Sequence, residues 1–475
     1  MTIDALPDNA LLGTFEFYLG KDDPDHSDYR HPYDGWQKLV CVCRRWRWVV
    51  FTSPRRLDLK LFCTGQRSVN SKTLDIWPAL PIVVVAEDMG SEQDVTNVIA
   101  ALRHHNRVCK ISCRSRQLQN TTTLLKGFGA IDGPFPALTS LKLIISFGQN
   151  VPVLPDSFLG GSAPRLRSLD LQGIPNPSIG KLLSSTTNLV RLSLSRIPHS
   201  GYIPPKTIIP CLSALLKLES LELRFQYPRP LAHRATRHPP PLTRLVFPNL
   251  TSLDFRGDIE YLEDILSQIE TPILNKSHFR LFNQLVFDTP LFGQFIRRTE
   301  TFKATHTASV KLFCRVVVIT LSNREQKAYS YSQALRLEII CKPLDWQLSA
   351  LAQVLNSFSS SLSTLESLEI EGSHDDWQDE IEAIQWQEFL HSFTSVREMT
   401  LGFKDSVRRI APALQELAGE GATEVLPALQ NIFLRTYDWR PSGSVKEAIG
   451  YFIATRQLYG NPVNVLYQEN RVGIS

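Results

Sequence analysis

A six-residue pattern of hydrophobic and polar positions, L-x-x-L-x-L, recurs through most of the chain after residue 136. Successive copies are separated by 28, 23, 29 and 32 residues, and the last ones by 31 and 33. The eight copies begin at Leu138, Leu166, Leu189, Leu218, Leu250, Leu365, Val396 and Leu429. Alternating apolar positions are typical of a strand that buries one face. The spacing therefore predicts one short strand per repeated unit.

Helical patterns lie between these strands. Residues Tyr261–Ile269 and Leu348–Phe358 place apolar side chains on one face of a helix. The 115 residues between the copies at Leu250 and Leu365 have room for about three less regular copies. Candidate strands in this interval are Leu274, Val316–Thr320 and Leu335–Ile339. We expect units of one strand and one helix throughout.

A strand followed by a helix every 23–33 residues resembles a leucine-rich repeat. The resemblance implies an α/β solenoid with parallel strands on its concave face and helices on its convex face, because stacking is what buries the apolar positions of each unit. The Asn that usually follows the strand is missing in most copies, so we expect an irregular solenoid. An ordinary α/β domain with chance L-x-x-L-x-L phrases is the alternative.

The residue between the last two apolar positions of each copy points away from the core. Four of these eight residues are acidic, and stacked like charges repel. We take a substrate-binding face there as a hypothesis, with a preference for a basic or hydrogen-bond-donating segment. Its proposed residues are Asp170, Ser193, Glu222, Asp254 and Glu369. Arg224 and Arg256 could instead pair with these acids, and a solvated face is an equal alternative.

The first sixty residues have a different pattern. Asp8 is a good N-cap, and Leu11, Leu12, Phe15 and Leu19 follow on one helical face. A polar stretch with two prolines, residues 21–34, predicts an exposed loop. Its Asp and His residues lack the Gly and final Glu of an EF-hand loop, so we expect no metal there.

A second helix is predicted from about residue 34 to residue 50. One of its faces is apolar, whereas Trp48 lies on the opposite, polar face. Pro54 ends this helix, and Leu57, Leu59 and Leu61 alternate as a strand would. The apolar face contains Trp36, Leu39, Val40, Cys43, Trp46 and Val50. A helical hairpin that packs only on itself is the simplest interpretation.

Leu6-Pro7, the apolar residues of the first helix, and Val42-Cys43-Arg44-Arg45-Trp46-Arg47 with the following Pro54 resemble the F-box. The resemblance covers residues 5–62 and is closest to F-box proteins of basidiomycete fungi, although the loop at 20–35 is longer than in a compact F-box. It implies docking on the Skp-type adaptor of a Skp–cullin–F-box ubiquitin ligase. The implied adaptor-binding residues are Leu6, Pro7, Leu11, Leu12, Phe15, Trp36, Leu39, Val40, Arg45, Trp46 and Trp48.

Composition narrows the function further. The 475 residues carry a net charge of +4, without the excess expected of a nucleic-acid binder. No signal peptide and no bilayer-spanning apolar segment is evident, so we expect a cytoplasmic or nuclear protein with no membrane contact and eight reduced cysteines. A basic cluster, residues 103–116, could touch an acidic partner, but a solvated helix face and turn is the simpler interpretation.

No nucleotide loop, nucleophile elbow, zinc-protease motif or paired Cys-x-x-Cys motif is present, so we expect no enzyme, cofactor or metal site. The predicted parts are an F-box-like module (1–62), a linker with first strand and helix units (63–135), the solenoid (136–436) and a C-terminal cap (437–475), in which Lys446–Leu458 is helical and Val463–Tyr467 extended.

Together these features predict a substrate-receptor subunit that holds a Skp-type adaptor, and through it a cullin, while its repeats hold an unidentified protein substrate. We expect a monomer outside that complex. A non-catalytic repeat scaffold with a vestigial F-box, and an enzyme with an unrecognised site, are the alternatives.

Overall fold

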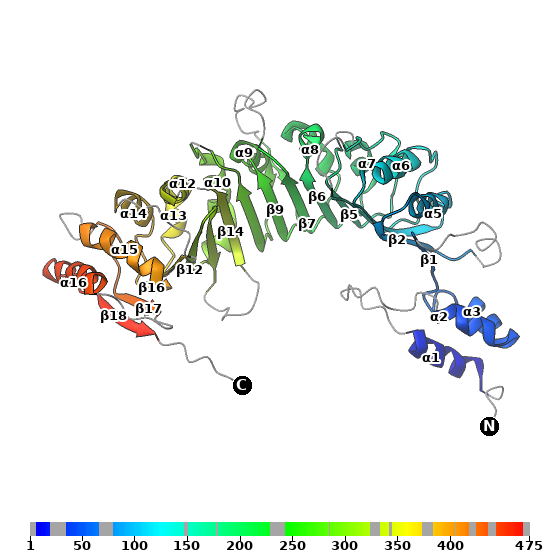
Figure 1. Ribbon diagram of the computed structural model, residues 1–475, viewed down its shortest axis with the longest axis horizontal. Coiled ribbons are helices and arrows are strands. Elements are labelled where there is room, and N and C mark those ends of the chain that lie inside the picture. Colours follow the sequence, from blue (N-terminus) through cyan, green and yellow to red (C-terminus); the bar gives the residue numbers. More distant parts are fainter. Residues whose placement is uncertain are drawn as a thin grey trace. The chain divides into compact units, whose positions relative to one another are not determined.

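The computed structural model describes residues 6–19, 35–65, 79–146, 151–176, 179–228, 243–284, 286–323, 333–341, 344–372, 383–402, 404–417, 424–435 and 443–468. It divides into two compact units, residues 1–203 and 204–475 (Figure 1). The predicted loop at 21–34 lies outside the described residues.

The first unit opens with three helices: α1 (Asp8–Leu19), α2 (Gly35–Val42) and α3 (Arg44–Thr52). The prediction of one continuous helix up to residue 50 is wrong, because the chain is extended at Cys43 (φ −155°, ψ 170°). The sulfur of Cys43 accepts a hydrogen bond from the backbone N–H of Trp46, 3.4 Å away, and so caps α3. The apolar face predicted for one long helix is therefore divided between α2 and α3.

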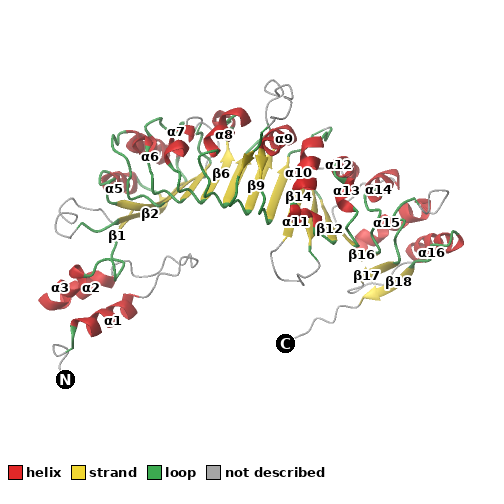
Figure 2. Cartoon of the chain, turned by 180° about the vertical axis from the view of Figure 1, so that it is seen from behind, coloured by secondary structure: helices red, strands yellow, loops and turns green. Residues whose placement is uncertain are grey.

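Six parallel strands follow in the first unit, each hydrogen-bonded to the next along the chain. They are β1 (Leu61–Thr64), β2 (Ile82–Met89), β3 (Val108–Ser115), β4 (Ser140–Ile145), β5 (Ser168–Gln172) and β6 (Arg191–Ile197). The connecting helices are α5 (Glu92–Leu102), α6 (Leu118–Gly129), η2 (Phe158–Gly161) and α7 (Ile179–Ser185), with η3 (His199–Gly201) after the last strand. The helices lie on one face of the sheet (Figure 2). In each unit, we call the face of the sheet that its helices leave uncovered the open face of that unit.

The alternation of the repeated phrase is what builds this sheet. In β4 and β5 the second and third apolar residues, Leu141, Leu143, Leu169 and Leu171, are buried, while the residues between them are partly exposed. Before the first repeat copy, two helix asparagines bond to the backbone at the ends of β1 and β2. The side-chain amide of Asn97 donates to the carbonyl of Gly65 (2.7 Å), and that of Asn120 to the carbonyl of Met89 (2.9 Å). These bonds satisfy buried carbonyls where a strand turns towards its helix.

The second unit has the strand order β7-β9-β11-β14-β13-β12-β15-β16-β17-β18, and a separate parallel pair, β8 with β10. Its strands are β7 (Ser220–Phe225), β8 (Leu245–Val246), β9 (Ser252–Gly257), β10 (Ile269–Glu270), β11 (Lys276–Leu281), β12 (Thr307–Phe313), β13 (Val316–Ser322), β14 (Gln333–Ile340), β15 (Ser367–Gly372), β16 (Glu398–Gly402), β17 (Asn431–Arg435) and β18 (Asn464–Gln468). The predicted stack of parallel strands is therefore confirmed over most of this unit.

One part of the second unit departs from the prediction. Strand β13 runs antiparallel to both β12 and β14, and so the three strands form a meander. Only two residues, Cys314 and Arg315, separate β12 from β13, too few for the crossover that parallel neighbours need. The predicted strand at Leu274 is also wrong, since β11 begins two residues later.

The helices of the second unit are α8 (Pro205–Leu212), α9 (Ile259–Gln268), α10 (Pro290–Arg298), α11 (Glu300–Lys303), α12 (Leu344–Asn356), α13 (Ser359–Leu362), α14 (Ala383–Leu390), α15 (Lys404–Leu417) and α16 (Gly443–Leu458). The two helices predicted between strands correspond to α9 and α12. The predicted terminal helix and strand correspond to α16 and β18. Among the described residues, no helix is both long and apolar enough to span a bilayer.

Candidate functional site

Most of the residues that the F-box resemblance implies for adaptor binding form the core of the helical module. Their side chains are at most 7% exposed, so they shape the module and do not themselves present a surface to a partner. The six buried residues are Leu11, Leu12, Phe15, Trp36, Leu39 and Val40. Leu6, Arg45 and Trp46 are half-buried, and Pro7 and Trp48 are exposed.

Arg45 and the contacts of two tryptophans hold the module together and fix it to the chain that follows. The guanidinium of Arg45 donates to the Asp8 carboxylate (2.7 Å) and to the carbonyl of Leu6, which joins α3 to the start of α1. The rings of Phe15 and Trp46 meet edge to face, with centroids 4.8 Å apart. The indole N–H of Trp36 donates to the carbonyl of Lys60 (2.9 Å) and fixes the module to the segment that leads into β1.

Among the described residues of the module, four large apolar side chains remain in solvent. Trp48 is 60% exposed, as its position on the polar face predicted, and Val42 at the end of α2 is 59% exposed. Phe17 and Tyr18 are also exposed, 89% and 53%. Val42 was not predicted to be exposed, because a continuous helix was expected there. Phe17 lies outside the helical face of Leu11 and Phe15, whereas Tyr18, seven residues after Leu11, lies on that face, so periodicity alone does not distinguish it from the core. We call these four residues the apolar surface of the module.

The open face of the first unit contains two residues of the predicted substrate face. In the register of β4, β5 and β6, Asp170 lies between Lys142 and Ser193. Burial raises the pKa of Asp170, and the attraction of Lys142, 3.9 Å away, together with a hydrogen bond from Ser193, opposes that shift only in part. Asp170 is thus an acid of raised pKa beside a cation.

In the second unit, the predicted acids have basic partners. Arg224 makes a bidentate contact with Asp254 (2.6 and 2.5 Å) and lies 3.1 Å from Glu222. Burial favours the neutral form of Asp254, but the hydrogen bonds from Arg224 and His278 outweigh it and lower its pKa. The pairing that the sequence allowed for Arg224 is therefore present, and the expected excess of acid is not.

The centre of this open face is a cluster that the sequence did not reveal. Glu338 is 2% exposed and contacts Arg280, Arg336 (2.7 Å) and His278 (3.1 Å). Burial alone would raise the pKa of Glu338, but its hydrogen bonds to His278, Arg280 and Arg336 lower it well below the usual range. Since the other nitrogen of His278 lies 3.0 Å from Asp254, the imidazole bridges two carboxylates. The strands β11 and β14 that carry these residues lack the clear repeat phrase.

A second group of charges lies over β12, β15 and β17. Glu369 of the predicted substrate face contacts Arg435, and Glu371 lies 2.6 Å from Lys311 and 3.3 Å from Arg435. Burial and the nearby Glu371 raise the pKa of Glu369 against the attraction of Arg435. Two acids thus face two bases, and this part of the open face is close to neutral.

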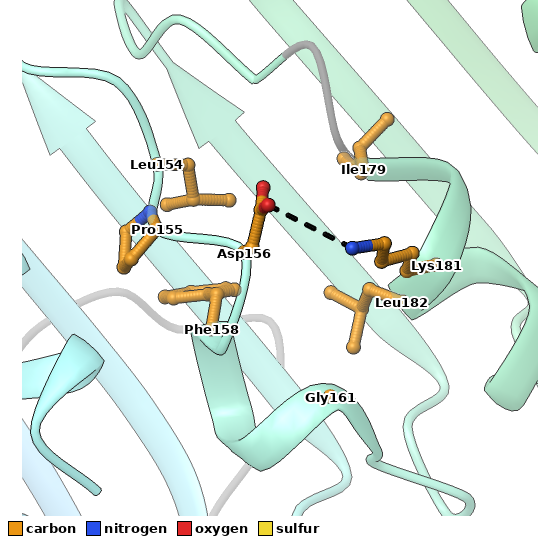
Figure 3. A pocket seen from close by; sticks show the side chains of 8 residues that line it. All are labelled: Leu154, Pro155, Asp156, Phe158, Gly161, Ile179, Lys181 and Leu182. Carbon is orange, nitrogen blue, oxygen red and sulfur yellow. Dashed lines mark ion pairs between the residues drawn. The ribbon is translucent and has the colours of Figure 1, made fainter.

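A small recess lies between η2 and α7 of the first unit (Figure 3). Leu154, Phe158 and Leu182 line it, and Asp156 and Lys181 form an ion pair of 3.7 Å at its rim. Its interior of about 10 Å³ is at the lower limit for a single water molecule. The recess therefore offers no substrate site. In the part of the chain that the structure describes, no cluster of three or more His, Cys, Asp or Glu residues has the arrangement of a metal site.

No protein-family model and no curated protein matches this chain. Among solved structures, it is similar to the TLR13–ssRNA13 complex, with 12% identity, a TM-score of 0.30 and coverage of 86% of this chain. The chain spans about half, 49%, of that protein. It is also similar to the leucine-rich repeat-containing protein LegL7 from Legionella pneumophila, with 12% identity, a TM-score of 0.27 and coverage of 82% of this chain and 97% of LegL7. Likeness of this degree carries no functional argument, and the repeat architecture rests on the strand register described above.

Proposed function

We propose that this chain is a non-catalytic substrate receptor of a Skp–cullin–F-box ubiquitin ligase. The helical module holds a Skp-type adaptor, and the open face of the repeats holds a protein substrate. The observation that carries the proposal is the apolar surface of the module beside a core with F-box-like residue order. A small module with four exposed large apolar side chains gains free energy when a partner covers them.

The chemistry of such a receptor is proximity. Holding the substrate and the ubiquitin-carrying enzyme on one assembly raises their effective concentration, and no side chain of this chain has to form or break a covalent bond. Two extended charged open faces suit the recognition of a protein segment better than that of a small molecule, because a small-molecule site is concave and mostly enclosed.

A pulldown with a purified Skp-type adaptor tests the adaptor half of the proposal. We expect Val42→Asp/Trp48→Asp to reduce adaptor retention at least tenfold, because burial of each large apolar side chain contributes about 1.5–3 kcal/mol. Both side chains are exposed in the free chain, so the variant should keep its fold.

The matched control is Leu216→Asp, since Leu216 is also 57% exposed but belongs to the second unit. It should retain the adaptor like the wild type. Full retention by Val42→Asp/Trp48→Asp would exclude this surface as the docking site, and a wild-type chain that binds no adaptor would favour a scaffold with a vestigial F-box.

A further inference from the structure

Strand β18 ends the sheet of the second unit, and only one of its edges is paired among the described residues (Figure 1). Strand β17 occupies that edge in parallel register, and the backbone N–H of Asn464 donates to the carbonyl of Gln430 there (2.8 Å). Backbone groups alternate between the two edges of a strand, so the N–H and C=O groups of Val465 and Tyr467 point to the free edge. These groups can pair with a further strand.

The free edge of β18 lacks the features that usually prevent strand pairing. Edge strands are commonly protected by charged side chains, by proline or by a bulge. The five residues of β18 include neither a charged residue nor a proline, and their register with β17 is continuous. Leu466 is 44% exposed and Tyr467 is 57% exposed. Strand β18 is therefore an uncharged, partly apolar strand that is open to pairing.

The last helix adds apolar surface to the same end of the unit. Helix α16 packs against α15, yet Tyr451 is 55%, Leu458 86% and Tyr459 58% exposed. Tyr451 and Leu458 are seven residues apart and so share one helical face. In repeat proteins the terminal unit usually has a polar outer face, which keeps the protein soluble. The apolar side chains of α16 and β18 instead indicate an end that a partner covers.

The sequence of β18 is complementary to itself when two copies run antiparallel. A two-fold axis at Leu466, the middle residue, pairs all five positions and places Val465 opposite Tyr467 of the second copy. Pairs of a β-branched and an aromatic residue are favourable across strands, and no like charges meet. Asn464 comes opposite Gln468, which is also uncharged.

The backbone groups agree with the same axis. Val465 and Tyr467 of opposite copies direct their N–H and C=O groups towards each other, which makes them hydrogen-bonded pairs of an antiparallel ladder. Leu466 then meets its counterpart as a non-hydrogen-bonded pair, in which the side chains approach more closely. Phe433, the half-buried register partner of Leu466 on β17, continues this apolar row. The pairing therefore joins the apolar rows of two open faces.

We propose that the chain forms a two-fold symmetric dimer in which β18 pairs with β18 of a second copy. Such a contact is isologous, so it covers both free edges at once and does not propagate into a filament. An unrelated strand would meet the same backbone groups but not this matched set of side chains. The dimer goes beyond the proposed function, uses none of the residues assigned to adaptor or substrate, and replaces the monomer expected from the sequence.

Sedimentation equilibrium of the full-length chain over a range of micromolar concentrations tests the proposal. We expect a monomer–dimer equilibrium whose dissociation constant rises at least tenfold in Leu466→Lys, because the two-fold axis places the two lysines opposite each other. Leu466 is exposed in the single chain, so the substitution should leave the fold intact, which thermal unfolding checks. The matched control is Ile384→Lys on α14, a 58% exposed position of the same unit, which should dimerise like the wild type.

Leu466→Cys tests the register of the pairing. In a non-hydrogen-bonded pair the two Cα atoms lie roughly 4.5 Å apart, which is within the range for a disulfide. Mild oxidation should therefore yield a cross-linked dimer of Leu466→Cys on non-reducing electrophoresis. The wild type, whose exposed Cys41 and Cys314 set the background, and Ile384→Cys should give no more than that background.

Three results would overturn the proposal. The first is a wild type that stays monomeric at all concentrations. The second is a dimer that Leu466→Lys weakens no more than Ile384→Lys, and the third is a dimer in which Leu466→Cys forms no cross-link above the background. Adaptor retention in the pulldown does not depend on any of these results, so the ligase function and the dimer can fail separately.

Discussion

At the scale of single residues, Glu338 holds the charge balance of the second unit's open face. Its nearly buried carboxylate is the shared partner of three basic side chains, of which Arg280 and Arg336 are 39% and 37% exposed. Removing a buried partner usually destabilises a protein strongly. Here the remaining cations can still reach water, which reduces the cost.

Glu338→Gln should therefore lower the free energy of unfolding by about 1–3 kcal/mol, the range for a broken buried charged hydrogen bond. Chemical denaturation at neutral pH measures this. The exposed Glu219→Gln serves as control and should change stability by no more than about 0.5 kcal/mol. A loss for Glu338→Gln that is no larger than the control would show that the cluster contributes nothing to stability.

His278 makes this open face sensitive to pH. Burial of the ring favours its neutral form, but the hydrogen bonds to Asp254 and Glu338 outweigh burial and raise the pKa of His278 above 6.5. A raised folded-state pKa stabilises the fold below the unfolded pKa, and the contribution disappears as pH rises through the folded value. Arg224, Arg280 and Arg336 also face this site and oppose its protonation in part.

We expect the wild type to lose stability as pH rises above about 6.5, the ordinary histidine pKa. His278→Gln should lack this component, because an amide does not take up a proton in this pH range. Denaturation curves at several pH values from 6 to 9 compare the two proteins. Parallel pH profiles would contradict the bridging role.

The residue scale also shows what the sequence could predict. The buried leucines of β4, β5, β7 and β9 follow directly from the repeated phrase, since alternation alone decides which side chains face the core. His278, Arg280 and Glu338 could not be predicted, because β11 and β14 depart from the phrase. Their register, which brings residues 58 apart in sequence into contact, is set by the intervening meander.

At the scale of elements, a buried carboxylate connects neighbouring helices of the second unit. Glu263 of α9 is 2% exposed and accepts hydrogen bonds from the backbone N–H groups of Leu291 (2.8 Å) and Phe292 (3.0 Å). These groups belong to the first turn of α10, where the N–H groups have no partner inside the helix. Glu263 of α9 therefore caps α10, the next helix along the chain.

Glu263→Ala should destabilise the protein by about 2–3 kcal/mol, because it leaves buried donors without an acceptor. Glu263→Gln keeps an acceptor oxygen in place and should cost less. Urea denaturation of both variants measures the difference. Equal losses for alanine and glutamine would mean that the charge or the packing of Glu263 matters, and not the cap.

Two of the wrong element predictions, the continuous helix and the uninterrupted parallel strands, have different physical causes. The break at Cys43 depends on one extended residue inside an otherwise helical pattern, which periodicity cannot detect. The meander has a signal in the sequence, the two-residue connection between β12 and β13, but the spacing of repeat copies does not reveal it. The parallel strands elsewhere were predictable because each unit repeats the same phrase at a length that fits one strand and one helix.

At the scale of the whole molecule, we propose that adaptor binding and substrate binding belong to separate surfaces. The apolar surface of the helical module takes the adaptor, and the charged open faces take the substrate. The order of the F-box-like residues could be recognised in the sequence. Most of the residues that it implied for adaptor binding, however, form the core of the module. Of the exposed residues that a partner could touch, Trp48 was predicted from its place on the polar face, whereas Phe17, Tyr18 and Val42 became apparent only when the three helices were placed around that core.

Hydrogen–deuterium exchange on the full-length chain, with and without a purified Skp-type adaptor, tests this division of tasks most directly. The account predicts added protection of backbone amides in α1, α2 and α3 and none in the strands from β7 to β17. Protection of those strands by the adaptor, or no protection anywhere in the chain, would contradict it.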